Sequence, residues 1–126
     1  MGFFNIRILA KSFRFAWRGL STAFKNEQNF RVQLIAAIII LALIVILPLA
    51  TWEIVALIMI TTLVLILELI NSIFEKLADI LEPRIHSYVR VIKDLMAATV
   101  LIASIVSVII GLIILLPHFY ILNIFK

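Results

Sequence analysis

The stretch WEIVALIMITTLVLILELINSIF, residues 52–74, decides the fold of this chain. It is apolar and long enough to span a bilayer, which takes about 20 residues in a helix. It nevertheless carries an acid, Glu68, close to one end. An ionised group in or near hydrocarbon is costly unless a partner compensates for it, so such acids are functional by default. We therefore predict a membrane protein with a functional site around Glu68.

Two further apolar stretches, near residues 32–50 and 95–116, are also long enough to span a bilayer. The 126 residues are 65% hydrophobic, with a mean hydropathy of +1.26, whereas soluble domains are about half apolar. The chain is short enough for one domain, residues 1–126. We predict an all-α fold in which Pro117 ends the third span; the segments are a surface helix (1–25), three transmembrane helices (27–50, 52–81 and 86–116) and a tail (117–126).

The N-terminal segment has two different faces. Apolar and aromatic residues recur at helical spacing on one face: Ile6, Leu9, Phe13, Trp17, Leu20 and Phe24. Basic residues recur on another: Arg7, Lys11, Arg14, Arg18 and Lys25. This pattern is typical of an amphipathic helix lying in the lipid headgroup plane. A signal peptide would need an apolar core after the first charges, but arginines recur through position 18.

Lysine and arginine also predict the topology. Six precede the first apolar stretch, none lies between the first and second, and one follows the third. The remaining four lie between the second and third stretches: Lys76, Arg84, Arg90 and Lys93. The positive-inside rule then places the N-terminus and the second connection in the cytoplasm.

Most of the acids gather at that predicted cytoplasmic end. One helical stripe, covering roughly a third of a turn, holds Glu68, Asn71, Ser72, Glu75 and Asp79. We expect Asn26 to cap the first span with Glu27 in its first turn, and Lys93 with Asp94 to open the third. Acids from all three spans can therefore converge on one layer just inside the membrane.

The chemistry of this layer favours a hard cation and a phosphate. There is no cysteine, and only three glycines, so neither a thiolate site nor a Gly-rich phosphate loop can be built. Oxygen ligands suit Mg²⁺, which is usually held by one or two carboxylates together with substrate phosphates. Neighbouring lysines and arginines can pair with phosphate, and a deeper carboxylate can accept a proton from a lipid hydroxyl. These are the parts of a phosphoryl-transfer site.

Four segments of the chain resemble the prokaryotic diacylglycerol kinase and undecaprenol kinase family of small membrane lipid kinases. They are FRFAWRGL (13–20), NEQNFR (26–31), LELINSIFEKLAD (67–79) and IHSYVRVIKDLMAATVLI (85–102). The resemblance needs no gaps over roughly residues 10–112. The spacing of Glu68, Asn71, Glu75 and Asp79, with a Lys-Asp pair opening the next helix, is highly specific.

The resemblance implies a role for each matching residue. Glu68 corresponds to the general base, and Glu27 and Glu75 to the ligands of the Mg²⁺ that accompanies ATP. The remaining ATP- and phosphate-site positions are Lys11, Asn71, Asp79, His86, Lys93 and Asp94. The family also implies a homotrimer with composite sites, in the bacterial cytoplasmic membrane, with a lipid alcohol as the second substrate and the active site facing the cytoplasm.

The lipid itself is less clearly indicated. Pro83 and Ala97 follow the undecaprenol kinase branch, with Ala97 at a lipid-binding position where diacylglycerol kinases carry serine. Phe15 and Ala16 replace a Tyr-Ser pair of the other branch, and Arg84 replaces a family acid, which leaves the adenine contacts open. These features favour undecaprenol slightly over diacylglycerol.

Other interpretations compete with a lipid kinase. A small proton-coupled transporter or channel could use an intramembrane glutamate, but its acid would lie near the middle of the bilayer. A purely structural membrane peptide leaves the acidic stripe unexplained. Among single residues, Glu68 could serve helix packing, His86 could be an ordinary surface histidine, and His118 is expected in the tail at the opposite interface.

Overall fold

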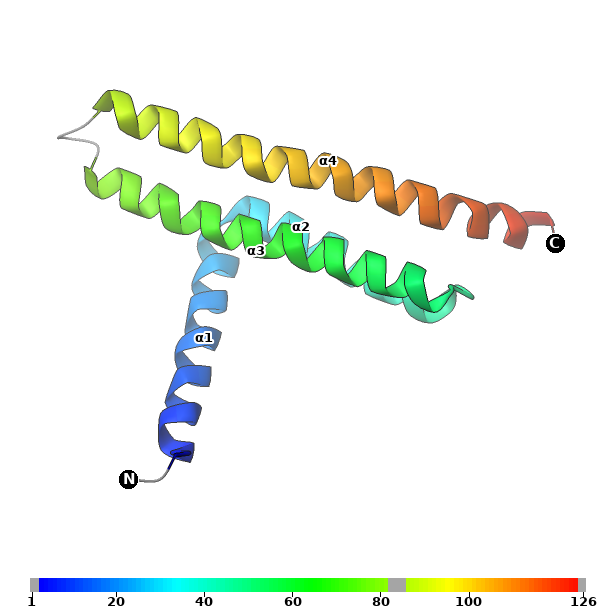
Figure 1. The fold of residues 1–126 in the computed structure, drawn as a ribbon, viewed down its shortest axis with the longest axis horizontal. Helices are drawn as coiled ribbons and strands as arrows, with labels where there is room; N and C mark the ends of the chain where they lie inside the picture. Colours follow the sequence, from blue (N-terminus) through cyan, green and yellow to red (C-terminus); the bar gives the residue numbers. More distant parts are fainter. Residues whose placement is uncertain (1–2, 82–85, 125–126) are drawn as a thin grey trace.

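The computed structural model describes residues 3–81 and 86–124, except for the side chains of His86 and Ile124. This part of the chain folds into four helices: α1 (Ile6–Asn26), α2 (Gln28–Ile46), α3 (Thr51–Leu81) and α4 (His86–Ile124). The predicted all-α fold is therefore confirmed. Helices α2, α3 and α4 run side by side in alternating directions, and α1 extends away from them from its junction with α2 (Figure 1).

Three of the described helices are long and apolar enough to cross a membrane: α2, α3 and residues 87–123 of α4. The 31 residues of α3 and 39 residues of α4 correspond to about 46 Å and about 58 Å of helix. The hydrocarbon core of a bilayer is only about 30 Å thick. Both helices therefore extend beyond it, and the ends of α3 and α4 can carry polar chemistry.

The junction between α1 and α2 differs from the prediction. Asn26 is the last residue of α1 instead of a cap, and Glu27 lies between the helices instead of in the first turn of α2. Glu27 is extended, with φ −108° and ψ 110°. Its N–H donates to the Ala23 carbonyl (2.8 Å), and its own carbonyl accepts from the Arg31 N–H (3.3 Å). A single extended residue thus turns the chain while its backbone groups stay bonded.

The Arg31 side chain secures the same junction. Its Nη1 donates to the carbonyls of Phe24 and Lys25, both at 3.0 Å. The last carbonyls of a helix have no partner within the helix. A cation placed at this end also favours the helix dipole. Arg31 therefore acts as a cap for α1 supplied from α2, and it fixes the position of Glu27 between them.

The buried apolar core lies at the other end of the bundle, away from α1. It contains Leu47 from the connection between α2 and α3, Leu57 from α3, and Ile114 and Leu115 from α4, and partly buried side chains of α2 pack against it. Helix α2 ends at Ile46, earlier than the predicted residue 50, because Leu47 is extended ahead of Pro48. The residue before a proline is disfavoured in helical conformation.

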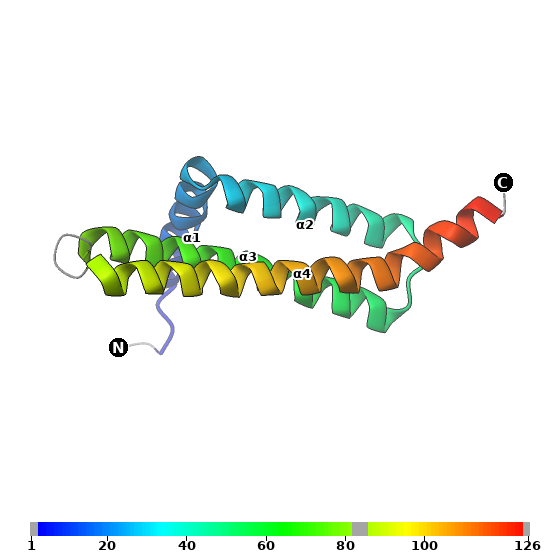
Figure 2. The same ribbon diagram turned by 90° about the horizontal axis from the view of Figure 1, so that it is seen from above.

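The prediction that Pro117 ends the third span is wrong. Helix α4 continues through Pro117 to Ile124, so residues 117–124 are helical and do not form a separate tail. Proline removes one backbone hydrogen bond and bends a helix without always stopping it. Figure 2 shows α4 bending toward its C-terminal end.

His118 explains why the extension packs back on the bundle. Its Nδ1–H donates to the Ile114 carbonyl (2.8 Å), and its Nε2 lies 3.4 Å from Glu53 Oε2. The same Glu53 oxygen accepts from the Ala50 N–H at 2.8 Å. The first turn of α3 and the last part of α4 are therefore joined by a polar contact that the sequence did not reveal.

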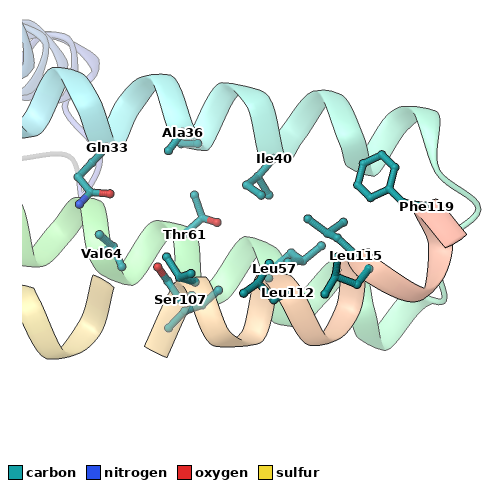
Figure 3. Close-up of a pocket in the computed structure, with 15 residues that line it drawn as sticks. Gln33, Ala36, Ile40, Leu57, Thr61, Val64, Ser107, Leu112, Leu115 and Phe119 are labelled. Carbon is teal, nitrogen blue, oxygen red and sulfur yellow. The ribbon is translucent and has the colours of Figure 1, made fainter. Parts of the chain in front are cut away.

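A cavity of ≈ 300 Å³ lies in the middle of the bundle among α2, α3 and α4. Figure 3 shows Gln33 and Val64 toward one end of it and Phe119 at the other. Gln33 Nε2 donates to Ser104 Oγ at 3.2 Å, which joins α2 to α4. Polar side chains that bond between helices are a common way of joining membrane helices. The lining of this cavity does not include the predicted site residues.

Candidate functional site

The predicted acidic stripe lies on α3, at the end of the bundle where α1 joins α2. Glu68 is 2% exposed, and Asn71 and Ser72 are each 6% exposed. Helical periodicity places these three side chains on one face, which packs into the protein. The Ser72 hydroxyl donates to the Glu68 carbonyl at 3.0 Å, so it is satisfied within its own helix. Glu68 and Asn71 are left as the buried groups available for chemistry.

Three polar side chains from two elements surround the Glu68 carboxylate. The Asn29 side chain, in the first turn of α2, hydrogen-bonds to it. The charges of Glu75 and Glu27 also lie close enough to act on it. Three negatively charged carboxylates in one layer repel one another unless a cation lies between them. The arrangement therefore attracts a cation to the layer.

Asn71 and Glu75 are joined within α3. Asn71 Nδ2 donates to Glu75 Oε1 at 2.9 Å, and Glu75 is half-buried. The Asn71 Oδ1 atom is buried with no hydrogen-bond partner among the described residues. A buried acceptor without a partner is costly and calls for an explanation. An amide oxygen beside a carboxylate is a ligand pair that Mg²⁺ accepts.

Glu27 meets an unexpected partner. Lys76 Nζ lies 2.7 Å from Glu27 Oε1, joining α3 to the junction of α1 and α2. Lys76 directly follows Glu75 in the helix, so its side chain lies about 100° around the helix axis from Glu75 and off the acidic stripe. Sequence reasoning counted it only as a topology signal. Glu27, which was predicted as a metal ligand, is therefore paired with the Lys76 ammonium in this structure.

Asp79 and Lys93 form a second ion pair farther along α3. Lys93 Nζ lies 2.7 Å from Asp79 Oδ1, and this contact joins the end of α3 to the beginning of α4. Asp94 and Ala97 follow on α4, and both are exposed. The acids that act on one another, Glu27, Glu68 and Glu75, come from the α1–α2 junction and from α3. Among the described contacts Asp94 does not join them and Asp79 is paired with a lysine, so the convergence predicted from all three spans is found only in part.

Two predicted ATP-site residues are not brought to the carboxylates within one chain. Lys11 lies in α1, 16 residues before Glu27. That distance is about 24 Å of helix, in a helix that points away from the bundle (Figure 1). Lys11 instead lies over the Phe15 ring, 5.7 Å from its centroid. His86 begins α4, but its side chain falls outside the described part, as do Pro83 and Arg84.

A groove of ≈ 690 Å³ runs between α1 and α3 beside this layer. Its walls are mainly apolar, with Phe15, Leu20, Leu69 and Ile73 among them. Its charged lining residues are Arg18, Glu27 and Lys76. The groove therefore combines a lipid-like surface with cations and a carboxylate, which suits an amphiphilic or phosphate-bearing ligand.

The donor set fits Mg²⁺ only if other ligands come with it. Among the residues with described side chains, no three His, Asp or Glu groups come close enough to hold a metal ion on their own. Mg²⁺ keeps several waters and usually takes one or two carboxylates plus substrate phosphates. The half-buried Glu75, the unpartnered oxygen of Asn71 and the nearby Glu27 meet that requirement.

Comparison with known protein families agrees with the geometry. The model of the family described as prokaryotic diacylglycerol kinase matches residues 14–115. The chain belongs to this family. The match contains α2, α3, the site residues from Glu27 to Ala97 and most of α4.

Individual members of the family are similar along most of this chain. A diacylglycerol kinase of Synechocystis is 36% identical over 110 residues, which cover 86% of this chain and 63% of that protein. A diacylglycerol kinase of Escherichia coli is 34% identical over 111 residues, which cover 88% of this chain and 91% of that protein. An undecaprenol kinase of Bacillus subtilis is 33% identical over 109 residues, which cover 85% of this chain and 87% of that protein. Relatives with both names are thus about equally similar.

Two residues of the site were missed by sequence reasoning. Asn29 lies two positions after Glu27 in the NEQNFR segment, and Lys76 directly follows Glu75. Neither falls on the α3 stripe that carried the prediction. Their contacts depend on the directions in which α1 and α2 extend from Glu27. The spacing of residues within a helix does not predict these directions. An amide so close to a predicted metal ligand was the one available signal for Asn29.

Proposed function

We propose that this protein is an ATP-dependent lipid kinase that phosphorylates a membrane lipid alcohol, undecaprenol or diacylglycerol, at the cytoplasmic interface. The observation that carries the proposal is the buried Glu68 beside Glu27 and Glu75 at the end of an apolar bundle. Membership of the family supports it, since the relatives are named as kinases of these two lipids.

Glu68 is proposed as the general base. It accepts the proton of the lipid hydroxyl while that oxygen attacks the γ-phosphorus of ATP and the bond to the ADP oxygen breaks. The products are the lipid phosphate and ADP. The Asn29 side chain holds the carboxylate in place by a hydrogen bond. A base buried near the interface suits a substrate that remains in the membrane, because only the hydroxyl of the lipid has to reach it.

Glu75 and Glu27 are proposed as the metal ligands, with Asn71 in support. Mg²⁺, when bound, neutralises the charge that develops on the transferring phosphoryl group. Asn71 orients Glu75 through its Nδ2 donor and offers its free Oδ1 to the same space. We assign the contacts with ATP and its phosphates to five further residues: Lys11, Asp79, His86, Lys93 and Asp94.

A homotrimer with composite sites is proposed from the family resemblance. Within one chain Lys11 lies about 24 Å of helix away from Glu27. A neighbouring protomer therefore offers a way to bring Lys11, or an equivalent cation, to the phosphates. The described part of the fold does not favour the transporter alternative, because the carboxylates other than Glu53 gather at one end of the bundle.

A phosphate-transfer assay tests the proposal directly. Detergent-purified protein is mixed with γ-labelled ATP, Mg²⁺ and either undecaprenol or diacylglycerol, and the lipid fraction is examined for label. We expect transfer to a lipid alcohol that depends on both Mg²⁺ and the lipid. ATP consumption that does not respond to lipid, with no labelled lipid formed, would contradict the assignment.

A further inference from the structure

Lys76 and Glu27 form an ion pair in the acidic layer, with 2.7 Å between Nζ and Oε1. The Lys76 side chain is 55% exposed and the Glu27 side chain 21% exposed. The ammonium thus reaches inward from solvent onto a carboxylate that is mostly covered. In this arrangement the ammonium contacts Oε1 of Glu27, one of the two oxygens that Glu27 would offer to a divalent cation.

The surroundings of Lys76 give it a second possible partner. Lys76 lines the groove between α1 and α3, together with Arg18 and Glu27. Lysine has a flexible four-carbon stem and three donors, so its ammonium can move several ångströms without any change in the backbone. Lys76 can leave Glu27 and still remain beside the groove, where phosphate oxygens would be attractive acceptors.

We propose that Lys76 is an exchange cation: it neutralises Glu27 in the nucleotide-free protein and passes to a phosphate of the nucleotide when a divalent metal takes over Glu27. This inference rests on the proposed function only in assigning Glu27 as a metal ligand. Its consequence is selectivity for metal-bound nucleotide over the free metal.

The physical reason is that the displaced Lys76 ammonium finds a different partner in each case. Free metal must displace the ammonium from Glu27 and leaves it with water alone. Metal that arrives with a nucleotide also brings phosphate oxygens, so the displaced ammonium gains a new charged partner. Partly exposed ion pairs are weak, so the displacement is readily reversible. Lys76 therefore lowers the affinity for free metal and raises the affinity for metal-nucleotide.

Direct metal binding provides the first test, without any need for turnover. Free Mn²⁺ is titrated into the purified full-length protein, without nucleotide, and followed by electron paramagnetic resonance. Lys76→Met removes the charge and keeps the chain length, so it should tighten Mn²⁺ binding by about threefold to fivefold, the size of a partly exposed ion pair. Lys76→Arg keeps the charge and should stay within a factor of two of wild type, in line with the lower end of that range.

Lys25→Met is the matched control. It removes one lysine charge from the last turn of α1, where the side chain is exposed, and leaves the Lys76–Glu27 pair in place. If the effect of Lys76→Met were only a general change in net charge, Lys25→Met would tighten Mn²⁺ binding equally. We expect no such change in the control, and an equal effect of the two variants would overturn the proposal.

Nucleotide binding provides the second test. The same variants are titrated with Mn²⁺ and a non-hydrolysable ATP analogue, and Lys76→Met should weaken binding of the complex by about threefold to tenfold. Opposite changes in the two titrations support exchange. Loss of affinity in both would mean that Lys76 only holds Glu27 in place, and no change in either would also overturn the proposal. Failure of the lipid kinase proposal would appear separately, as wild-type protein that transfers no phosphate to lipid.

Discussion

At the residue scale, α3 buries polar groups where an apolar helix would pack more stably. Burying a polar group without a hydrogen bond costs free energy. Ser72 avoids that cost by bonding within its helix, and Glu68 is bonded by Asn29. Asn71 satisfies only its donor, since its Oδ1 has no described partner. Sites that bind ligands often sacrifice stability in this way, so the cost is itself an argument for function.

Glu68→Gln should lower kcat by about 10² to 10⁴, which is the range of general base catalysis. The amide keeps the size of the side chain and its contact with Asn29 but cannot accept the hydroxyl proton. The KM for ATP should change little, because the proposed metal ligands are retained. Steady-state kinetics on purified protein decide it. A normal kcat with a raised KM for ATP would show that Glu68 serves the nucleotide instead.

Glu75→Gln should reduce Mg²⁺-dependent transfer by at least tenfold, corresponding to a loss of about 1.4 kcal/mol in transition-state stabilisation. The amide cannot supply the negative charge that the metal needs. The protein should still fold and insert, because Asn71 can still donate to the amide oxygen. Glu53→Gln, at the other end of α3, is the control and should retain activity. Retention of more than a tenth of wild-type turnover by Glu75→Gln would remove it from the metal site.

At the element scale, the sequence predicted most of what depends on periodicity. Apolar length gave the three spans, and helical spacing gave the shared face of Glu68 and Asn71, which the structure buries together. Contacts between elements were not available in the same way. The pairing of Lys76 with Glu27 depends on the one extended residue between α1 and α2, and a pattern within one helix cannot show it.

Pro117 is the clearest failure of local reasoning. Proline is a strong local signal for the end of a helix, yet α4 runs on to Ile124. The turn that follows Pro117 has contacts of its own: His118 bonds to the Ile114 carbonyl within α4, and its Nε2 lies 3.4 Å from Glu53 Oε2 on α3. A signal read from one residue is overridden when the following turn has a partner elsewhere in the fold.

His118→Ala should therefore destabilise the protein by about 1 kcal/mol, since it removes the hydrogen bond to the Ile114 carbonyl and the contact with Glu53 Oε2. The effect is expected on stability and not on activity, because the candidate site lies at the other end of the bundle. Thermal unfolding in detergent measures it. Asn123→Ala, an exposed substitution in the same segment, is the control. Equal unfolding temperatures for the two variants would mean that the Glu53–His118 contact contributes nothing measurable.

At the scale of the whole molecule, the distribution of charge predicts the direction of insertion. Six basic residues lie between positions 7 and 31, four lie between positions 76 and 93, and Lys126 alone lies at the other end. The carboxylates of the candidate site lie at the end that holds the ten. We predict a cytoplasmic N-terminus and an external C-terminus. A periplasm-active reporter fused after Lys126 should give signal, and the same reporter fused after Pro83 should not. The reverse result would move the site away from ATP.

The lipid preference also belongs to the whole molecule, because lipid chains pack along the outside of several helices. The proposed chemistry would need only a hydroxyl delivered to the depth of Glu68, and both undecaprenol and diacylglycerol carry one. Selectivity must therefore come from packing of the chain beside the site, where Ala97 is exposed on α4, one turn after Lys93. A difference of about 1.4 kcal/mol in transition-state binding gives a tenfold preference.

We expect undecaprenol to be phosphorylated with a higher kcat/KM than diacylglycerol, following Ala97 and Pro83. Competition between the two lipids in one detergent measures the ratio directly. Ala97→Ser should shift that ratio toward diacylglycerol, because the hydroxyl adds a polar contact at the lipid face, and Ala98→Ser is the neighbouring control. A kcat/KM for diacylglycerol equal to or above that for undecaprenol would refute the preference, while labelled product from either lipid would leave the kinase assignment intact.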